Sequence, residues 1–381
     1  MVVVVWNKGP GSAPVTIVSG RWLDNPSFPP RLPIEAMKDT LTDANFPRTT
    51  DLRVYHLGLR PGEVANRLIT VGSPSRAHTI ASYLDVTPKP FQLSSERGFL
   101  TITGRYKRVP VSIVSIGMGA PNMDFFVREV RECLVGDMLV IRLGSCGGLI
   151  HVPVGTVVVP KACISVTRNV DFDFVNPEEN DDVPYKISKP VYADPEFHDV
   201  VHQALESVKP SGSTTPIVAG ITNASADSFY SSQGRQTSFP DNNETLIEQI
   251  IASTSDVATL EMETHHLYHL AECWSKKRKV AKVSEAALPP LSTGPVKPVA
   301  SSDKAAGTTT ETSALAAPDT VIRAAAAQMV FASRTSQDFI TPQQVQDTER
   351  WTGKGVLEAL IRMELAADRV HPDEGSVWAL Q

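Results

Sequence analysis

Short apolar runs alternate along the chain with stretches in which apolar residues recur at helical spacing. The run at 66–71 stops at a glycine and a proline, and residues 76–84 then carry apolar side chains at helical intervals. This pattern predicts a strand, a tight turn and a helix. Residues 99–103 and 109–116 predict a β-hairpin, which is followed by a helix at about 123–134.

The same alternation continues through the rest of the chain. Further strands are predicted at 138–143, 155–159, 216–221, 257–260 and 324–332, and further helices at 196–208, 245–252, 261–274 and about 356–368. The strands are too continuously apolar for a sheet with one exposed face. We therefore predict an α/β fold with three layers (α/β/α), in which helices cover both faces of a central mixed, largely parallel sheet.

Two segments depart from this pattern. Residues 1–50 carry many prolines without a periodic pattern, and they predict an irregular N-terminal extension. Residues 275–320 hold no aromatic residue and are rich in Pro, Ser, Thr, Ala and Gly, which predicts a disordered insertion within a domain over 51–381. The basic run at 276–279 is typical of a solvated surface, and less often of a nuclear-import signal.

Composition narrows the class of ligand. The 42 acidic residues outnumber the 36 basic ones, so the chain has no overall positive field for nucleic acid or an anionic membrane. The four cysteines are far apart and form no C-x-x-C pair, which argues against a disulfide scaffold or a structural zinc site. Neither a membrane-spanning run nor a secretory signal is recognisable. We expect a cytoplasmic protein with a small-molecule ligand.

Three glycine-rich turns follow predicted strands: VGSPSRA (71–77), SIGMGAPN (115–122) and RLGSCGGL (142–149). In α/β sheets, glycines at the carboxyl ends of strands let backbone N–H groups approach an anion. Arg76 and Arg142 add guanidinium groups, which suit phosphate. Neither the dinucleotide nor the P-loop fingerprint is present, and the glycines alone would more often be simple tight turns.

Three more motifs occur in register with this pattern: VYHLGL (54–59), FYSSQGR (229–235) and LEMET (260–264). Together the six motifs resemble the nucleoside phosphorylase family over about residues 51–370, less the insertion, and the Gln-x-Arg element resembles uridine phosphorylases. The phosphate turn reads GSP, as in eukaryotic members, where bacterial relatives have an aspartate at the serine position.

The resemblance implies where phosphate and ribose would bind. The phosphate site would comprise Gly72, Arg76, Arg142, Ser145 and, from a neighbouring subunit, Arg97. The ribose site would comprise Glu263 for the 2′- and 3′-hydroxyls, Met262 against the sugar, Glu261 beside them, and His56 reaching the 5′-hydroxyl across the subunit interface. A carboxylate, which only accepts hydrogen bonds, suits a diol.

The resemblance also implies a pyrimidine base site. The amide of Gln233 would match the imide edge of uracil, Arg235 and Arg334 would donate to its oxygens, and Phe229 would offer a stacking face. Purine-cleaving relatives place an aspartate after the last buried strand, where this chain has Ser333 and Arg334.

The implied reaction is the reversible phosphorolysis of uridine to uracil and ribose 1-phosphate, in nucleoside salvage and catabolism. Arg142, Arg235 and Arg334 would be the catalytic residues, phosphate would be a co-substrate, and no cofactor or metal is expected. The implied assembly is a homodimer or a dimer-based oligomer with shared sites. A broad purine and pyrimidine phosphorylase, a nucleosidase and a non-catalytic nucleoside-binding protein are the alternatives.

Two further features of the sequence are candidates for a metal site and for a nucleophile. His265 and His269 lie four residues apart on a predicted helix, as metal-binding pairs do, but no third ligand follows at a matching spacing. Cys146 lies in the third glycine motif, but no His–acid pair that would activate it is recognisable. We expect neither group to be functional.

Overall fold

The computed structural model describes residues 41–150, 152–283 and 319–380, and side chains are left out at 277–283. Residues 1–40 of the predicted extension and 284–318 of the predicted insertion lie outside the described residues. A two-stranded ladder, β1 (Leu41–Thr42) with β2 (Arg48–Thr49), precedes the sheet. No helix among the described residues is long and apolar enough to cross a membrane.

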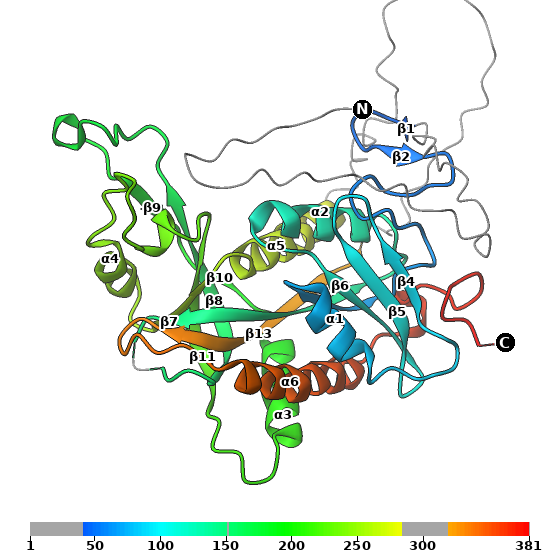
Figure 1. Cartoon of the computed structure of the whole chain (residues 1–381). Coiled ribbons are helices and arrows are strands. Elements are labelled where there is room, and N and C mark those ends of the chain that lie inside the picture. Colours follow the sequence, from blue (N-terminus) through cyan, green and yellow to red (C-terminus); the bar gives the residue numbers. More distant parts are fainter. Residues whose placement is uncertain (1–40, 151, 284–318, 381) are drawn as a thin grey trace, which may run out of the picture. The chain divides into compact units, whose positions relative to one another are not determined.

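The centre of the fold is an 11-stranded mixed sheet (Figure 1). Its strands are β3 (Arg67–Val71), β4 (Phe91–Ser94), β5 (Leu100–Tyr106), β6 (Val109–Ser115), β7 (Met138–Gly148), β8 (Val157–Arg168), β9 (Tyr185–Ile187), β10 (Val191–Tyr192), β11 (Ile217–Ala226), β12 (Val257–Glu261) and β13 (Ile322–Ser333). The main path runs β10-β8-β11-β12-β7-β3-β6-β5-β4, with β13 paired to β7 and β8, and β9 paired to β8. The pairs β6-β3, β3-β7, β7-β13, β8-β11 and β11-β12 are parallel, as predicted for a largely parallel sheet.

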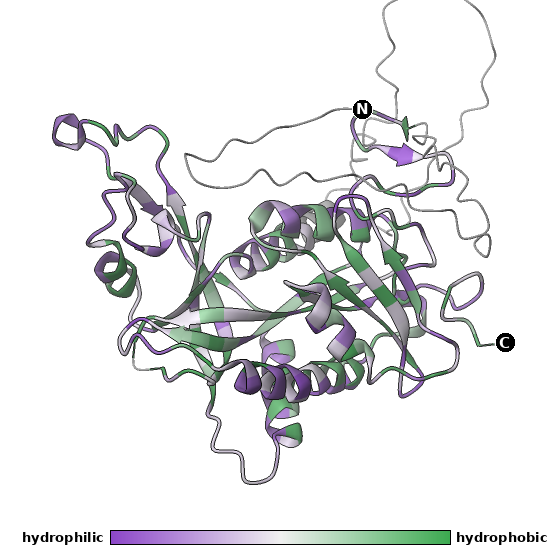
Figure 2. Ribbon diagram, viewed as in Figure 1, coloured by the Kyte–Doolittle hydropathy of each residue, from purple (hydrophilic) through white to green (hydrophobic). Residues whose placement is uncertain are grey.

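Helices cover both faces of the sheet. They are α1 (Pro74–Ala81), α2 (Ala120–Arg131), α3 (Pro195–Val208), α4 (Leu246–Ser253), α5 (Thr264–Val283) and α6 (Pro342–Arg362), with short 3₁₀ turns η1 (Pro177–Glu179), η2 (Ser231–Gln233) and η3 (Ala367–Arg369). On the central strands, odd-numbered residues such as Ile69 and Ile141 pack with α1, α3 and α6. Even-numbered residues such as Leu68 and Val140 pack with α2 and α5. Both faces are therefore buried, which explains the continuous apolar runs (Figure 2).

The structure corrects several predicted boundaries. The third glycine motif does not end a strand, because β7 continues through Gly148 while β13 pairs beside it. The C-terminal helix begins at Pro342 rather than near 356 and ends at Arg362, where 368 was expected. Its start is capped by Thr341, whose side chain accepts from the Gln344 backbone. This part of the helix carries few large apolar residues, so the apolar pattern does not predict it.

Other elements also differ from the prediction. α5 continues to Val283, so the first residues assigned to the insertion at 275 are helical. The strands β8 and β11 run several residues beyond their predicted ends. Three strands that the apolar pattern does not predict are only two to four residues long: β4, β9 and β10. Short strands offer too few positions for a period of two to be recognised.

Candidate active site

Two glycine turns and one buried arginine form the first part of the candidate site. β3 ends at Val71, Gly72 follows it, and Ser73 is the N-cap of α1. Arg142 projects from β7, and a Cβ placed on Gly72 would lie 3.7 Å from its Nη2. Gly117 and Gly119 follow β6 with φ of 73° and 92°, a backbone conformation that favours glycine. Because Gly72 has no side chain, no Cβ lies against the guanidinium of Arg142 at this turn.

Arg76 brings a second buried guanidinium from α1. Its Nε donates to Oε1 of Glu349 on α6 at 2.8 Å, and its Nη1 donates to the Leu143 carbonyl at 3.3 Å. Burial lowers the pKa of Arg76, Glu349 opposes that shift, and the charge of Arg142 reinforces it. The two arginines are thus close enough to repel each other, as expected for a pair prepared for an anion. Glu349 lies in none of the six motifs and was not predicted from the sequence.

Glu263 lies against Arg142. Its Oε2 accepts from Nη2 of Arg142 at 2.8 Å, and its Oε1 accepts from the backbone N–H of Gly119 at 2.7 Å. Both side chains are buried. Each carboxylate oxygen has one donor here and keeps capacity for another, which is what two sugar hydroxyls would require. The structure therefore brings the predicted phosphate arginine and the predicted ribose carboxylate together.

Glu261 lies beside Glu263, as the resemblance implies, and its hydrogen bonds are made within its own chain. Its buried carboxylate accepts hydrogen bonds from five donors of the chain itself: Asn223 Nδ2, Ser225 Oγ, the Glu263 N–H, and the N–H and Oγ1 of Thr264. Burial and the nearby Glu263 raise the pKa of Glu261. These bonds fix the turn from β12 into α5. Glu261 thus holds Glu263 in place, while Met262 between them is half-buried.

The predicted base residues gather in a second cluster. Arg235 donates from Nη1 to the Phe229 carbonyl at 2.7 Å and to Oε1 of Gln233. Arg334, which follows β13, donates to the carbonyls of Gln233 and Gly234 at 3.1 and 3.0 Å. Because its oxygen is engaged, buried Gln233 keeps its amide N–H₂ for other partners.

The aromatic ring of this cluster is partly covered. The guanidinium of Arg235 lies 3.8 Å from the ring centroid of Phe229, so the cation occupies one face of the ring. Burial lowers the pKa of Arg235 to about 10, and the charge of Arg334 contributes to the shift. Arg235 is therefore still a cation at neutral pH.

Asn243 supports the base cluster and was not identified from the sequence. Its Nδ2 donates to the carbonyls of Ser231 and Arg235 at 2.8 and 3.2 Å, closing the loop that carries Gln233. Gly234 in that loop has φ of 61°, and a Cβ there would lie 2.8 Å from Ile247. A polar residue eight positions beyond the end of the motif carries no sequence signal for this role.

His56 and Arg97 belong to a third group. The His56 ring stacks on Phe125, with 3.7 Å between centroids, and its Nδ1 lies 2.6 Å from Oε1 of Glu129. The Arg97 guanidinium lies 4.8 Å from the ring centroid of Tyr55 and donates to its hydroxyl. Among the described residues, these contacts do not join either side chain to the arginine–carboxylate cluster or to the base cluster. Ser145 is half-buried on β7, opposite Met329 of β13.

His265, His269 and Cys146 are the other candidate groups from the sequence. The rings of His265 and His269 stack with 5.9 Å between centroids, and burial lowers the pKa of His265 to about 4. In the part of the chain that the structure describes, no group of three His, Cys, Asp or Glu side chains could hold a metal ion. Cys146 is buried, which raises the pKa of its thiol and disfavours a nucleophilic thiolate.

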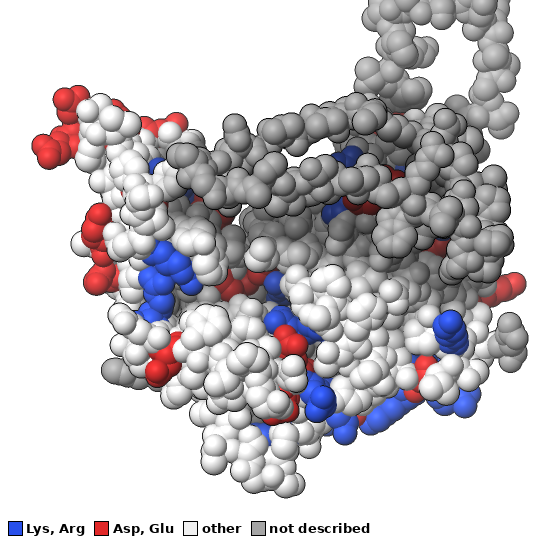
Figure 3. All heavy atoms as spheres, viewed as in Figure 1, with Lys and Arg blue, Asp and Glu red and all other residues white. Residues whose placement is uncertain are grey.

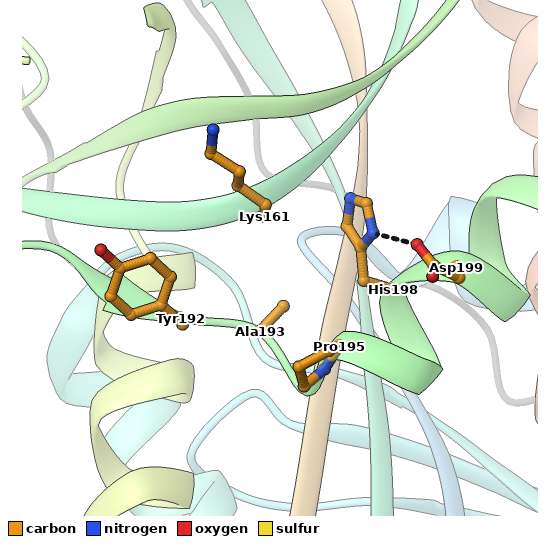
Figure 4. Close-up of a pocket in the computed structure, with 6 residues that line it drawn as sticks. All are labelled: Lys161, Tyr192, Ala193, Pro195, His198 and Asp199. Carbon is orange, nitrogen blue, oxygen red and sulfur yellow. Dashed lines mark hydrogen bonds and ion pairs between the residues drawn. The ribbon is translucent and has the colours of Figure 1, made fainter. Parts of the chain in front are cut away.

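Two surface hollows lie away from these clusters. A pocket of about 250 Å³ is lined by Lys161, Tyr192, Ala193, Pro195, His198 and Asp199 (Figure 4). An open groove of about 880 Å³ lies between the loops at 153–155 and 210–216 and the first half of α6. Neither hollow contains a predicted site residue. Basic and acidic side chains are interspersed over the visible face, so no broad positive surface is visible there (Figure 3).

The chain was compared with known proteins. The model of the phosphorylase superfamily matches residues 66–281. A uridine phosphorylase of Thermococcus kodakarensis is 30% identical over 242 residues, covering 62% of this chain and 79% of that protein. A DeoD-type purine nucleoside phosphorylase of Roseobacter denitrificans is 31% identical over 221 residues, covering 57% and 80%.

Solved structures are similar as well. A structure from a study of two uridine phosphorylases of the oomycete Phytophthora capsici has a TM-score of 0.68 and 33% identity, covering 86% of this chain and all of that one. A Trypanosoma brucei nucleoside phosphorylase shares the fold, with a TM-score of 0.60 at 19% identity, covering 84% of this chain and all of that one. The three-layer fold predicted from the sequence is thereby confirmed.

Proposed function

Because the chain belongs to the phosphorylase superfamily and is a nucleoside phosphorylase, we propose that it cleaves uridine reversibly with inorganic phosphate, giving uracil and ribose 1-phosphate. The relatives include both uridine and purine phosphorylases, so the choice of base rests on the base cluster. Gln233, Arg235 and Arg334 present hydrogen-bond donors there. Donors suit the carbonyl oxygens of uracil and the negative charge that it acquires on leaving. This cluster is the observation that carries the proposal.

The reaction follows from the two clusters. Arg76 and Arg142 hold phosphate, and Glu263 holds the ribose hydroxyls. A phosphate oxygen forms the new bond to C1′, the bond from C1′ to the uracil nitrogen breaks, and its electron pair leaves with uracil. Arg235 and Arg334 stabilise that charge. Phosphate is already anionic at neutral pH, so the proposal needs neither a general base nor a cofactor.

The direct test is uracil release from uridine with and without phosphate, followed by absorbance or chromatography. We expect release and formation of ribose 1-phosphate only when phosphate is present. Release without phosphate would identify a nucleosidase, and comparable cleavage of inosine would identify a broad-specificity phosphorylase. Binding of uridine without turnover would indicate a nucleoside-binding protein.

We further propose that two chains share each site. His56 and Arg97 have no contact with the other clusters among the described residues, whereas the resemblance implies that they serve ribose and phosphate across an interface. Such an exchange of residues requires a closed pair of chains in which each completes the site of the other.

Complementation tests this arrangement. Arg97→Ala and Arg235→Ala are each expected to be nearly inactive. After joint unfolding and refolding, about half of the dimers should be mixed, each with one intact site, so about a quarter of all sites should recover. Mass spectrometry verifies the mixed dimers. If activity stays at the level of the separate variants, Arg97 does not act across an interface.

A further inference from the structure

A chain of buried hydrogen bonds connects the arginine–carboxylate cluster to β13. Gln328 donates from Nε2 to Oγ1 of Thr264 at 2.8 Å, and that hydroxyl donates to Oε2 of Glu261 at 2.9 Å. Glu261 accepts from the backbone N–H of Glu263 at 2.9 Å, and Glu263 accepts from Nη2 of Arg142 at 2.8 Å. All five residues are buried. This series of hydrogen bonds therefore runs from Gln328 to Arg142 through the carboxylates of both glutamates.

Gln328 and Arg142, the two ends of this series of hydrogen bonds, both lie close to Gly144. Gly144 of β7 lies opposite Gln328 in the parallel ladder. A Cβ on Gly144 would lie 3.4 Å from Nε of Arg142 and 3.9 Å from Cγ of Gln328. In the part of the chain that the structure describes, Oε1 of Gln328 has no hydrogen-bond partner, and the same holds for Nε and Nη1 of Arg142, although all three atoms are buried. An unpaired acceptor and unpaired donors thus border the same small region, and unpaired buried polar groups are costly.

We propose that Gln328 is a positioning residue for the reaction: its Oε1 holds Arg142 from the side opposite Glu263, through one bound water molecule. Such a water would accept from Arg142 and donate to Gln328, within the two to four hydrogen bonds that buried waters usually make. The inference rests on the proposed function, because it assigns to Gln328 the orientation of the phosphate-binding arginine. A closed ring of hydrogen bonds would hold the guanidinium and both carboxylates in one geometry.

Gln328→Leu removes both hydrogen-bonding groups and keeps a similar volume. We expect it to weaken binding of inorganic phosphate and to lower kcat/KM for phosphate by about 10- to 100-fold, because small misplacements of catalytic groups have large effects. Titration calorimetry with inorganic phosphate and steady-state kinetics measure the two quantities. Met329→Leu is the matched control: it alters the next residue of β13, which is equally buried but packs into the core on the opposite face. This control should change neither quantity more than about twofold.

Gln328→Glu separates positioning from simple filling of the core. A protonated carboxyl can donate to Thr264 and accept as the amide does, whereas an ionised one loses the donor and adds a charge beside Glu261. The kcat/KM of this variant should therefore approach that of the parent at low pH and fall as pH rises. A residue that only fills space would change the melting temperature without changing the pH profile.

The outcomes are distinguishable. If Gln328→Leu binds phosphate and turns over like the parent, the role of Gln328 is wrong. If it does not fold, an unchanged pH profile of Gln328→Glu overturns the inference equally. If the parent binds phosphate but does not cleave uridine, the proposed substrate is wrong, and the calorimetric comparison still decides the role of Gln328.

Discussion

Replacement of Arg142 by alanine is expected to lower kcat/KM for uridine phosphorolysis by about 1000-fold, the upper range for loss of one preorganised donor group. The side chain has two tasks in the proposed site. Its Nη1 has no partner among the described residues and would donate to phosphate, and its Nη2 holds Glu263 at 2.8 Å. Its removal affects the phosphate and the ribose subsites together, so the KM values of both substrates should rise. Steady-state kinetics with each substrate varied in turn measure this.

The same substitution should affect stability. It removes the ion-pair partner of buried Glu263, which typically costs roughly 3–5 kcal/mol. Arg142→Lys keeps the charge but not the planar fork, and we expect about 100-fold loss of kcat/KM with a smaller loss of stability. Arg67→Met is the matched control, since Arg67 on β3 donates to the backbone carbonyls of Leu360 and Met363, outside the site. If folded Arg142→Ala keeps the kcat/KM of the parent, the proposed phosphate site is wrong.

Replacement of Arg235 by alanine is expected to lower kcat by about 100- to 1000-fold. The guanidinium would stabilise the charge on departing uracil, so the loss should appear in kcat more than in the KM for phosphate. It should also shrink with 5-fluorouridine, whose more acidic base leaves more easily. Comparing kcat for uridine and 5-fluorouridine in the parent and the variant measures this dependence.

The control for this experiment is Arg128→Ala. Arg128 is an exposed residue of α2 that pairs with Asp124 at 2.9 Å and contacts none of the three clusters. It should leave kcat unchanged. If Arg235→Ala loses the same factor with both nucleosides, Arg235 shapes the loop rather than stabilising the leaving group.

Specificity for the base depends on the same cluster. A purine would present a ring nitrogen that needs a proton on leaving, whereas Gln233 and Arg334 present donors suited to carbonyl oxygens. Discrimination against a base that leaves buried polar groups unpaired can reach several orders of magnitude. The comparison of uridine with inosine therefore tests the base cluster as well as the overall proposal.

The local pattern of apolar residues was sufficient to predict most of the fold. Apolar runs located β3, β6, β12 and β13, and helical spacing located α1, α2 and α3, because both faces of a covered sheet must be apolar. The motifs that resemble the nucleoside phosphorylases also pointed to four candidate site residues, and the structure brings these into two clusters: Arg142 with Glu263, and Gln233 with Arg235. These predictions needed only neighbouring residues.

Local pattern failed where packing decides the element. β7 continues through its glycines because β13 pairs alongside it, and a glycine-rich segment has little strand propensity of its own. The part of α6 that was not predicted, residues 342–355, packs closely at two glycines, with a Cβ on Gly353 2.8 Å from Ile80 and one on Gly355 2.7 Å from Leu205. Close approach of backbones replaces the large apolar side chains that mark a helix in sequence.

The sequence by itself determined the layers of this protein and the chemical types gathered at its site. Only the tertiary structure decided which groups orient them. Arg76 pairs with Glu349, 273 residues away, and Thr264 pairs with Gln328, 64 residues away. The tertiary structure also decided that the carboxylate of Glu261 accepts hydrogen bonds from five donors of its own chain. The physical reason is that hydrogen-bond partners are selected by the order and register of strands and by the helices packed on them, and neither is encoded in the spacing of any one motif.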